Sequence, residues 1–139
     1  MEAIRVVIVD DHQMVREAWK MLLHDQENIQ IIAECSSGIE ALKHVPELDV
    51  HIVLMDINMS PVNGFEATRK LLKRVPHIKI IGVSINNHPG YARNIMQLGA
   101  KGFVTKNSPR EEMIKAIQEV MKGKTYICKE MLQKMNQSK

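Results

Sequence analysis

Acidic, hydroxyl and lysine side chains follow four separate apolar runs of this sequence. They are Asp10 and Asp11, Asp56, Ser84, and Lys106. Carboxylates brought close together repel one another unless a cation lies between them. Oxygen ligands without thiolate or imidazole suit Mg²⁺, which binds one or two carboxylates and leaves positions open for a phosphate. A carboxylate with a metal, a lysine and a hydroxyl beside it can attack phosphorus and form an acyl phosphate. Any one of these residues alone is more often a turn, a cap or a solvated side chain, so the prediction depends on their joint placement.

Strand-like and helix-like patterns alternate along the chain and predict how these side chains are positioned. The β-branched and apolar runs lie at residues 4–9, 29–33, 51–55, 78–83 and 102–105, and helical spacing follows at about 14–22, 38–45, 64–75, 89–98 and 109–122. Alternation with short loops indicates a parallel sheet with helices on both faces. The length fits a flavodoxin-like α/β sandwich of five strands, in the order 2-1-3-4-5, with five helices. Strands 1 and 3 would then be neighbours, so the three carboxylates would meet in one crevice.

Capping residues support the predicted helix starts. Ser37 with Glu40 and Asn63 with Glu66 have the spacing of a cap and its third helical residue. Ser108-Pro109-Arg110-Glu111 similarly predicts Ser108 as the cap of the last helix.

The first helix has an apolar stripe that predicts its buried face. The stripe consists of Met14, Val15, Ala18, Met21 and Leu22. Trp19 lies one step away, so it marks either a partner surface or partial core burial.

Composition indicates one soluble, cytoplasmic domain. The chain has 139 residues with a formal net charge of +3, and no apolar run approaches the about 20 residues that span a bilayer. Cys35 and Cys128 suggest neither a disulfide framework nor a metal site.

We expect the domain to cover residues 1–123. Residues 124–139 form a linker or a C-terminal extension, for which an extra helix containing Ile127, Met131, Leu132 and Met135 is the alternative. The tail is basic, but a solvated segment is a better interpretation than nucleic-acid contact.

Four segments carry a resemblance to a known family. They are Val7–His12, Leu54–Gly64, Gly82–Ser84 and Gly99–Lys106. Over residues 3–122 the chain resembles the receiver domain of a bacterial two-component response regulator. Its first and last segments are similar to the subfamily with a C-terminal LuxR-type helix-turn-helix output domain, and no such domain is found after residue 123.

The resemblance implies a phosphoryl acceptor and a Mg²⁺ site. Asp56 would accept a phosphoryl group from a sensor histidine kinase. Asp11 and Asp56 would bind Mg²⁺ through their side chains, Asn58 through its backbone carbonyl and Asp10 through water. Lys106 would pair first with Asp56 and then with the phosphoryl group.

The resemblance also implies a conformational switch rather than an enzyme with turnover. Ser84 would move toward a phosphoryl oxygen, and Phe103 would repack inward and change the face formed by the fourth helix, fifth strand and fifth helix. Asn58 and Asn86 would tune spontaneous dephosphorylation. The output would be transcription through a DNA-binding domain outside this chain, with a homodimer on phosphorylation and no membrane partner.

The sequence departs from the family pattern at four places. Ser60-Pro61 shifts a usual proline by one position and affects only loop stiffness, and Ser84 replaces the commoner Thr but keeps the hydroxyl. Phe103 replaces Tyr and removes one hydrogen bond from the switch. Asn107 stands where many relatives have Pro, so we expect a trans peptide bond before it, since a non-proline cis bond costs about 2.5–4 kcal/mol.

Three other functions are weighed against the signalling switch. Residues 56–60 faintly resemble the nucleophile motif of haloacid-dehalogenase-like phosphatases, but Asn58 cannot be the acid that this motif needs. A pseudo-receiver would lack one or more of the site residues. An FMN-binding flavodoxin would need a phosphate cradle where residues 10–13 are acidic. Of the six histidines, only His12 lies beside the acidic pair.

Overall fold

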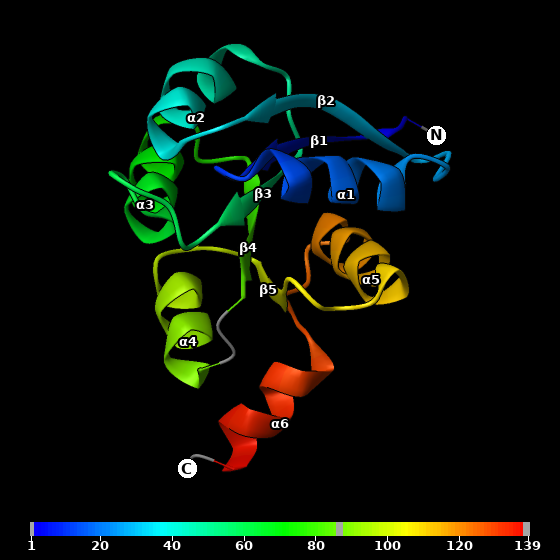
Figure 1. Ribbon diagram of the computed structural model, residues 1–139, viewed down its shortest axis with the longest axis vertical. Helices are drawn as coiled ribbons and strands as arrows, with labels where there is room; N and C mark the ends of the chain where they lie inside the picture. Colours follow the sequence, from blue (N-terminus) through cyan, green and yellow to red (C-terminus); the bar gives the residue numbers. More distant parts are fainter. Residues whose placement is uncertain (1, 86–87, 138–139) are drawn as a thin grey trace.

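The computed structural model describes residues 2–85 and 88–137, which form one parallel sheet with helices on both faces (Figure 1). The strands are β1 (Ile4–Val9), β2 (Ile29–Cys35), β3 (Ile52–Asp56), β4 (Lys79–Ser84), β5 (Gly102–Thr105) and β6 (Tyr126–Ile127). Their order is β2-β1-β3-β4-β5-β6, and every neighbouring pair is parallel. The predicted order of the first five strands is confirmed.

Helices connect the strands and cover the sheet. They are α1 (Gln13–Leu23), α2 (Gly38–His44), α3 (Gly64–Arg74), α4 (Pro89–Gln97), α5 (Arg110–Met121) and α6 (Lys129–Gln137), with a short 3₁₀ helix, η1, at Val45–Glu47. Helices α1 and α5 lie on one face of the sheet, and α2, α3 and α4 lie on the other (Figure 1). No helix in residues 2–85 or 88–137 is long and apolar enough to cross a membrane.

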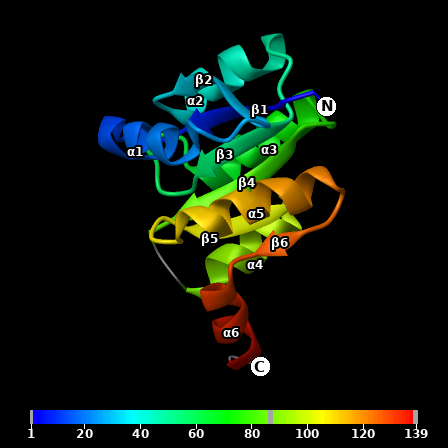
Figure 2. The same cartoon turned by 90° about the vertical axis from the view of Figure 1, so that its right-hand side faces the viewer.

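Five strands and five helices were predicted, and the described residues contain one more of each, β6 and α6. Strand β6 pairs with β5, with Gly102 opposite Tyr126 and Phe103 opposite Ile127. Helix α6 follows and extends from the body beside α4 (Figure 2). The extra helix is therefore present, but Ile127 belongs to a strand. A two-residue strand is too short to show periodicity. Its two half-buried residues pack against the core beside Cys128, which is 0% exposed.

The central strands form the core because both of their faces are covered. All residues of β3 are buried, and so are the last four of β1 and the last five of β4. Such strands are continuous apolar runs in the sequence. Asp56 and Ser84 are the polar exceptions, and they lie at the carboxyl ends of β3 and β4. Because burial of a polar side chain is costly unless it has a partner, these two residues indicate a functional site.

The buried face of α1 matches the predicted one only in part, since Val15 and Leu22 pack against the core as predicted. Met14 and Met21 are 85% and 78% exposed, and Ala18 is also exposed. Trp19 and Leu23 are fully enclosed instead, at 3% and 1%. Two overlapping stripes satisfy helical spacing here, and the stripe that buries the large indole removes more apolar surface from water.

Two of the three predicted helix caps are confirmed. The Ser37 hydroxyl accepts a hydrogen bond from the Glu40 backbone N–H at 3.0 Å. The Asn63 side chain likewise accepts from the Glu66 backbone N–H at 2.9 Å. Each side chain satisfies a backbone donor that has no partner within its helix.

The predicted cap of α5 was wrong. Pro109, not Ser108, occupies the cap position, and its side chain makes no capping hydrogen bond. The Ser108 hydroxyl lies 3.1 Å from the Thr105 hydroxyl instead. Proline fixes an extended turn that shifts the start of the helix by one residue.

Removal of the Trp19 indole should cost far more stability than removal of an exposed α1 side chain. We expect Trp19→Ala to lower the free energy of unfolding by about 3–5 kcal/mol, because it leaves a large cavity. Met21→Ala, on the same helix, should change it by less than about 0.5 kcal/mol. Urea unfolding followed by circular dichroism measures both, and equal losses would contradict the assigned face of α1.

Candidate functional site

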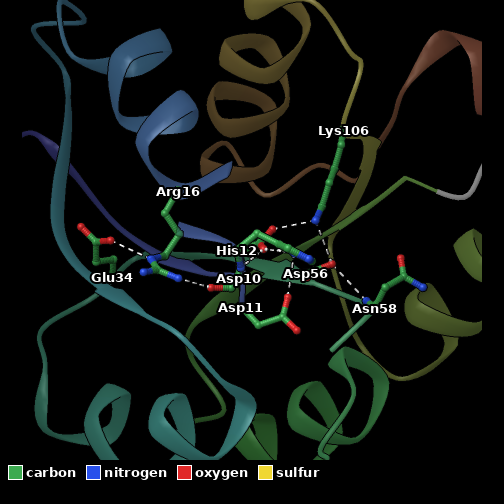
Figure 3. Close-up of polar contacts among 8 residues, drawn as sticks. All are labelled: Asp10, Asp11, His12, Arg16, Glu34, Asp56, Asn58 and Lys106. Atoms are coloured by element: carbon green, nitrogen blue, oxygen red, sulfur yellow. Dashed lines mark hydrogen bonds and ion pairs between the residues drawn. The ribbon is translucent and has the colours of Figure 1, made fainter. Parts of the chain in front are cut away.

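The carboxyl ends of β1, β3, β4 and β5 bring the predicted polar residues together. Asp10 follows β1, Asp56 ends β3, Ser84 ends β4 and Lys106 follows β5. The Lys106 backbone N–H donates to the Ser84 carbonyl at 2.8 Å, which fixes the end of β5 against β4. Figure 3 shows Asp10, Asp56 and Lys106 converging from these separate strands.

The Lys106 ammonium lies between two buried carboxylates. Its Nζ atom is 2.8 Å from Asp10 Oδ2 and 3.3 Å from Asp56 Oδ1. Asp10 and Asp56 are only 2% and 1% exposed. Two carboxylates at this depth need a cation, and one lysine supplies a single positive charge for both.

One oxygen of the Asp56 carboxylate is held and the other is not. Oδ1 accepts from the Asn58 backbone N–H at 3.0 Å as well as from Lys106. Oδ2 is buried and has no hydrogen-bond partner among the described residues. The carboxylate is thus oriented while one of its oxygens stays available to a ligand, and buried polar atoms normally have partners.

The environment favours the protonated form of Asp56. Burial raises the pKa of Asp56 from its ordinary value of 3.8 to about 6, and the Asp10 charge acts in the same direction. The Asn58 N–H and the Lys106 ammonium oppose this rise only partly. A second positive charge at the site would relieve the remaining penalty.

Asp11 and His12 complete the acidic cluster on its exposed side. His12 Nδ1 lies 2.9 Å from Asp11 Oδ1 and 3.3 Å from Asp10 Oδ1. Ligand atoms of Asp10, Asp11, His12 and Asp56 all lie within 4.8 Å of one another. This donor set, together with the unpartnered Asp56 Oδ2, fits a hard divalent cation.

Ser84 and Asn58 are joined directly. The Ser84 hydroxyl donates to the Asn58 side-chain oxygen at 2.8 Å, which links the end of β4 to the loop after β3. The sequence predicted both positions at the site but not this bond, which spans 26 residues. Asn86 lies outside the described residues.

Phe103 is already directed inward. It is 0% exposed, and its carbonyl accepts from the Cys128 backbone N–H at 3.0 Å, just after β6. Its role as a switch stays a prediction. The peptide bond before Asn107 is trans as predicted, since the one cis bond in the described chain is Ser60–Pro61.

Two residues that support the site were missed by sequence reasoning. Arg16 donates to the Asp10 carbonyl at 2.7 Å and pairs with Glu34 Oε1 at 2.7 Å (Figure 3). A basic residue near the start of a helix is usually solvated, and its partner is 18 residues away. The one sequence signal for this contact was the predicted pairing of β1 with β2, which places Glu34 on the strand next to the one that Asp10 follows.

Gly64 also supports the site, although the sequence marked it only as the end of the family-like segment that contains Asp56. A Cβ atom on Gly64 would lie 2.3 Å from the Asp56 carbonyl oxygen and 2.5 Å from Ile57 Cα. Only glycine allows α3 to begin this close to the carboxyl end of β3, so it sets the path of the loop around Asp56.

Comparison with known proteins identifies this arrangement. Residues 6–118 match the model of the response regulator receiver domain family. The chain belongs to that family. The receiver domain is 39% identical to the response regulator GacA of Pseudomonas aeruginosa, over 95% of this chain and 62% of that protein. It is 35% identical to the response regulator UvrY of Escherichia coli, over 95% of this chain and 61% of that protein.

A solved structure gives the same classification. The crystal structure of a LuxR-family two-component response regulator from Aurantimonas sp. superimposes with a TM-score of 0.94 at 27% identity, over 99% of this chain and 98% of that chain. The predicted resemblance to receivers of the LuxR-type subfamily is therefore confirmed. The chain spans less than two thirds of the length of GacA and of UvrY.

Replacement of the buried Asp56 carboxylate should stabilise the metal-free receiver, but only above about pH 5. Because the pKa of Asp56 is higher in the folded than in the unfolded state, the protonated Asp56 side chain contributes its full stability below the unfolded pKa of 3.8. This contribution is lost as pH rises through the folded pKa of about 6. We therefore expect Asp56→Asn to be more stable than the native chain at pH 8, by roughly 1–3 kcal/mol, and about equal to it at pH 4. Urea unfolding in EDTA at pH 4, 6 and 8 measures this.

Asp49→Asn is the control for this experiment, because the Asp49 side chain is 88% exposed. A stability gain for Asp56→Asn that is the same at all three pH values would contradict the titration argument.

Proposed function

We propose that this receiver domain is a phosphorylation-dependent switch in which Asp56 accepts a phosphoryl group from the phosphohistidine of a sensor histidine kinase. The observation that carries the proposal is the buried Asp56 carboxylate, whose Oδ2 has no partner in residues 2–85 and 88–137 while Lys106 contacts its Oδ1. A buried carboxylate that only stabilised the fold would be expected to have both oxygens paired.

The transfer needs an ionised Asp56 and stabilisation of the phosphoryl oxygens. A carboxylate oxygen of Asp56 forms a bond to phosphorus as the P–N bond of the phosphohistidine breaks, and its electron pair returns to the imidazole nitrogen. Lys106 is closer to Asp10 than to Asp56, at 2.8 Å against 3.3 Å. It can therefore stay anchored on Asp10 while it donates a hydrogen bond to a phosphoryl oxygen.

Mg²⁺ is the cofactor in this proposal. Asp11 and Asp56 would hold it through their side chains, Asn58 through its backbone carbonyl and Asp10 through a water. The bound ion supplies positive charge that neutralises the phosphoryl oxygens. Asn58 suits this role, because its backbone is already fixed by the bond from its N–H to Asp56.

The signal would pass from Ser84 to the face formed by α4, β5 and α5. A phosphoryl oxygen that accepted the Ser84 hydroxyl would compete with the Asn58 side chain, its present acceptor. Any movement at β5 would reach the C-terminal segment, because the backbone N–H of Cys128 is bonded to Phe103. A shift of population between two such states is enough to change partner contacts.

The output is proposed from the subfamily. GacA and UvrY are named response regulators, and each is longer than the segment that matches this chain. We propose control of transcription through a DNA-binding segment, with a homodimer formed on phosphorylation. Spontaneous dephosphorylation would be slow and would be tuned by Asn58 and Asn86.

Incubation with acetyl phosphate tests the acceptor chemistry. The intact mass of the native chain should increase by one phosphoryl group, and only when Mg²⁺ is present. Asp56→Asn should abolish labelling, and Asp11→Asn should reduce it at least tenfold at limiting Mg²⁺, since it removes a metal ligand.

Asp49→Asn removes an exposed carboxylate and should label like the native chain. Adducts on a residue other than Asp56 would refute the assignment, and the absence of any adduct would favour the pseudo-receiver. Size-exclusion chromatography of the labelled chain tests the homodimer.

A further inference from the structure

The His12 ring is turned toward the acidic cluster although it could extend into solvent. Its side chain is 65% exposed, yet Nδ1 lies 2.9 Å from Asp11 Oδ1 and 3.3 Å from Asp10 Oδ1. Figure 3 shows the ring beside Asp10 and Asp11 rather than directed away from them. An exposed side chain held in one place needs an interaction that compensates for its lost rotamer freedom.

Helix capping does not explain this orientation. His12 is the N-cap residue of α1, but its side chain makes no capping hydrogen bond. The local hydrogen bonds are made by the His12 backbone instead. Its carbonyl accepts from the backbone N–H groups of Val15 and Arg16, and its N–H donates to Asp10 Oδ1 at 2.9 Å. The imidazole is thus free of any helical role and is held on the site side of α1.

The neighbouring oxygen atoms define where an ion would lie. Asp10 Oδ2 is already paired with the Lys106 ammonium, and Asp56 Oδ1 already accepts a hydrogen bond from the Asn58 N–H. The Asp11 carboxylate and Asp56 Oδ2 remain, and Asp56 Oδ2 is buried without a partner among the residues described. This buried, unsatisfied oxygen in the same cluster is independent of His12 and itself points to a ligand.

The spacing of His12 and Asp11 matches that of two ligands on one ion. Ligands at right angles around an ion, each about 2.1 Å from it, are about 3.0 Å apart. The distance between His12 Nδ1 and Asp11 Oδ1 is 2.9 Å. A cation bound to both atoms would therefore keep them about as far apart as they already are.

We propose that the His12 imidazole is a nitrogen ligand of the divalent cation, so that the site favours first-row transition-metal ions such as Mn²⁺ over Mg²⁺ more strongly than its carboxylates alone would. The proposal rests on the proposed function, because it concerns the same ion. Magnesium prefers oxygen ligands, whereas imidazole nitrogen suits the transition metals. His12 would thus set which ion the receiver takes from a mixture.

Pulsed electron paramagnetic resonance of the Mn²⁺-loaded chain tests the Mn–N bond directly. The native chain should show electron-spin-echo modulation from one directly bound ¹⁴N nucleus, and labelling of histidine with ¹⁵N should replace it by the ¹⁵N pattern. His12→Gln should abolish the modulation. His44→Gln, which changes an exposed histidine in α2, should leave it unchanged.

Isothermal titration calorimetry tests the selectivity. His12→Gln should raise the Kd for Mn²⁺ roughly tenfold or more, while the Kd for Mg²⁺ should change by less than about threefold. His44→Gln should change neither constant.

Three results would overturn the proposal: no nitrogen modulation in the native chain, modulation that survives His12→Gln, or equal weakening of both ions. The ¹⁵N measurement uses the native chain, so it shows whether a histidine binds the ion even if a variant fails to fold. Among the described residues, His12 is the histidine that lies in this acidic cluster. Labelling of the native chain by acetyl phosphate with Mg²⁺ separates the two proposals. Labelling without nitrogen modulation removes only the role of His12, whereas failure of both labelling and ion binding refutes the proposed function as well.

Discussion

The pairing of two buried carboxylates with one lysine is the constraint on which the rest of this structure depends. Asp10 and Asp56 are almost fully removed from water, and Lys106 contacts both. Removal of Lys106 would leave two buried carboxylates without a counter-charge, which is strongly destabilising. Three features of the backbone keep these side chains together. They are the strand order, the hydrogen bond from the Lys106 N–H to the Ser84 carbonyl, and the contact of Arg16 with the Asp10 carbonyl. The charge balance is still incomplete, and this incompleteness makes the site receptive to a cation.

Much of the fold and the centre of the site could be predicted from the sequence. Strands buried on both faces are unbroken apolar runs, so β1, β3 and β4 were readily recognised. The polar residues that end such runs must lie at one edge of a parallel sheet, and this rule placed Asp10, Asp56 and Lys106 together without any knowledge of distances. Caps with a local side-chain acceptor, such as Ser37 and Asn63, were also predictable because the interacting groups are only three residues apart.

The features that could not be predicted depend on contacts between distant residues. The buried side of α1 depends on where the Trp19 indole finds space, and two stripes of that helix satisfied the same periodicity. Strand β6 has two residues, and its place is set by β5 and by Glu112, which accepts hydrogen bonds from the Tyr126 hydroxyl and the Lys129 backbone N–H. The contacts of Arg16 with Glu34 and of Ser84 with Asn58 likewise join segments 18 and 26 residues apart. No local pattern encodes them.

The span of sequence over which the site is assembled affects its formation during protein synthesis. Asp10 leaves the ribosome early, whereas Lys106, which lies 2.8 Å from it, follows only after four more strands have been made. Domains fold as units during synthesis, and contacts between distant residues form late. A nascent chain that ends before β5 therefore holds the acidic residues without their lysine. The proposed phosphoryl-acceptor pocket thus exists only in a chain whose sheet is complete through β5, so the proposed transfer needs a receiver that has been synthesised through Lys106.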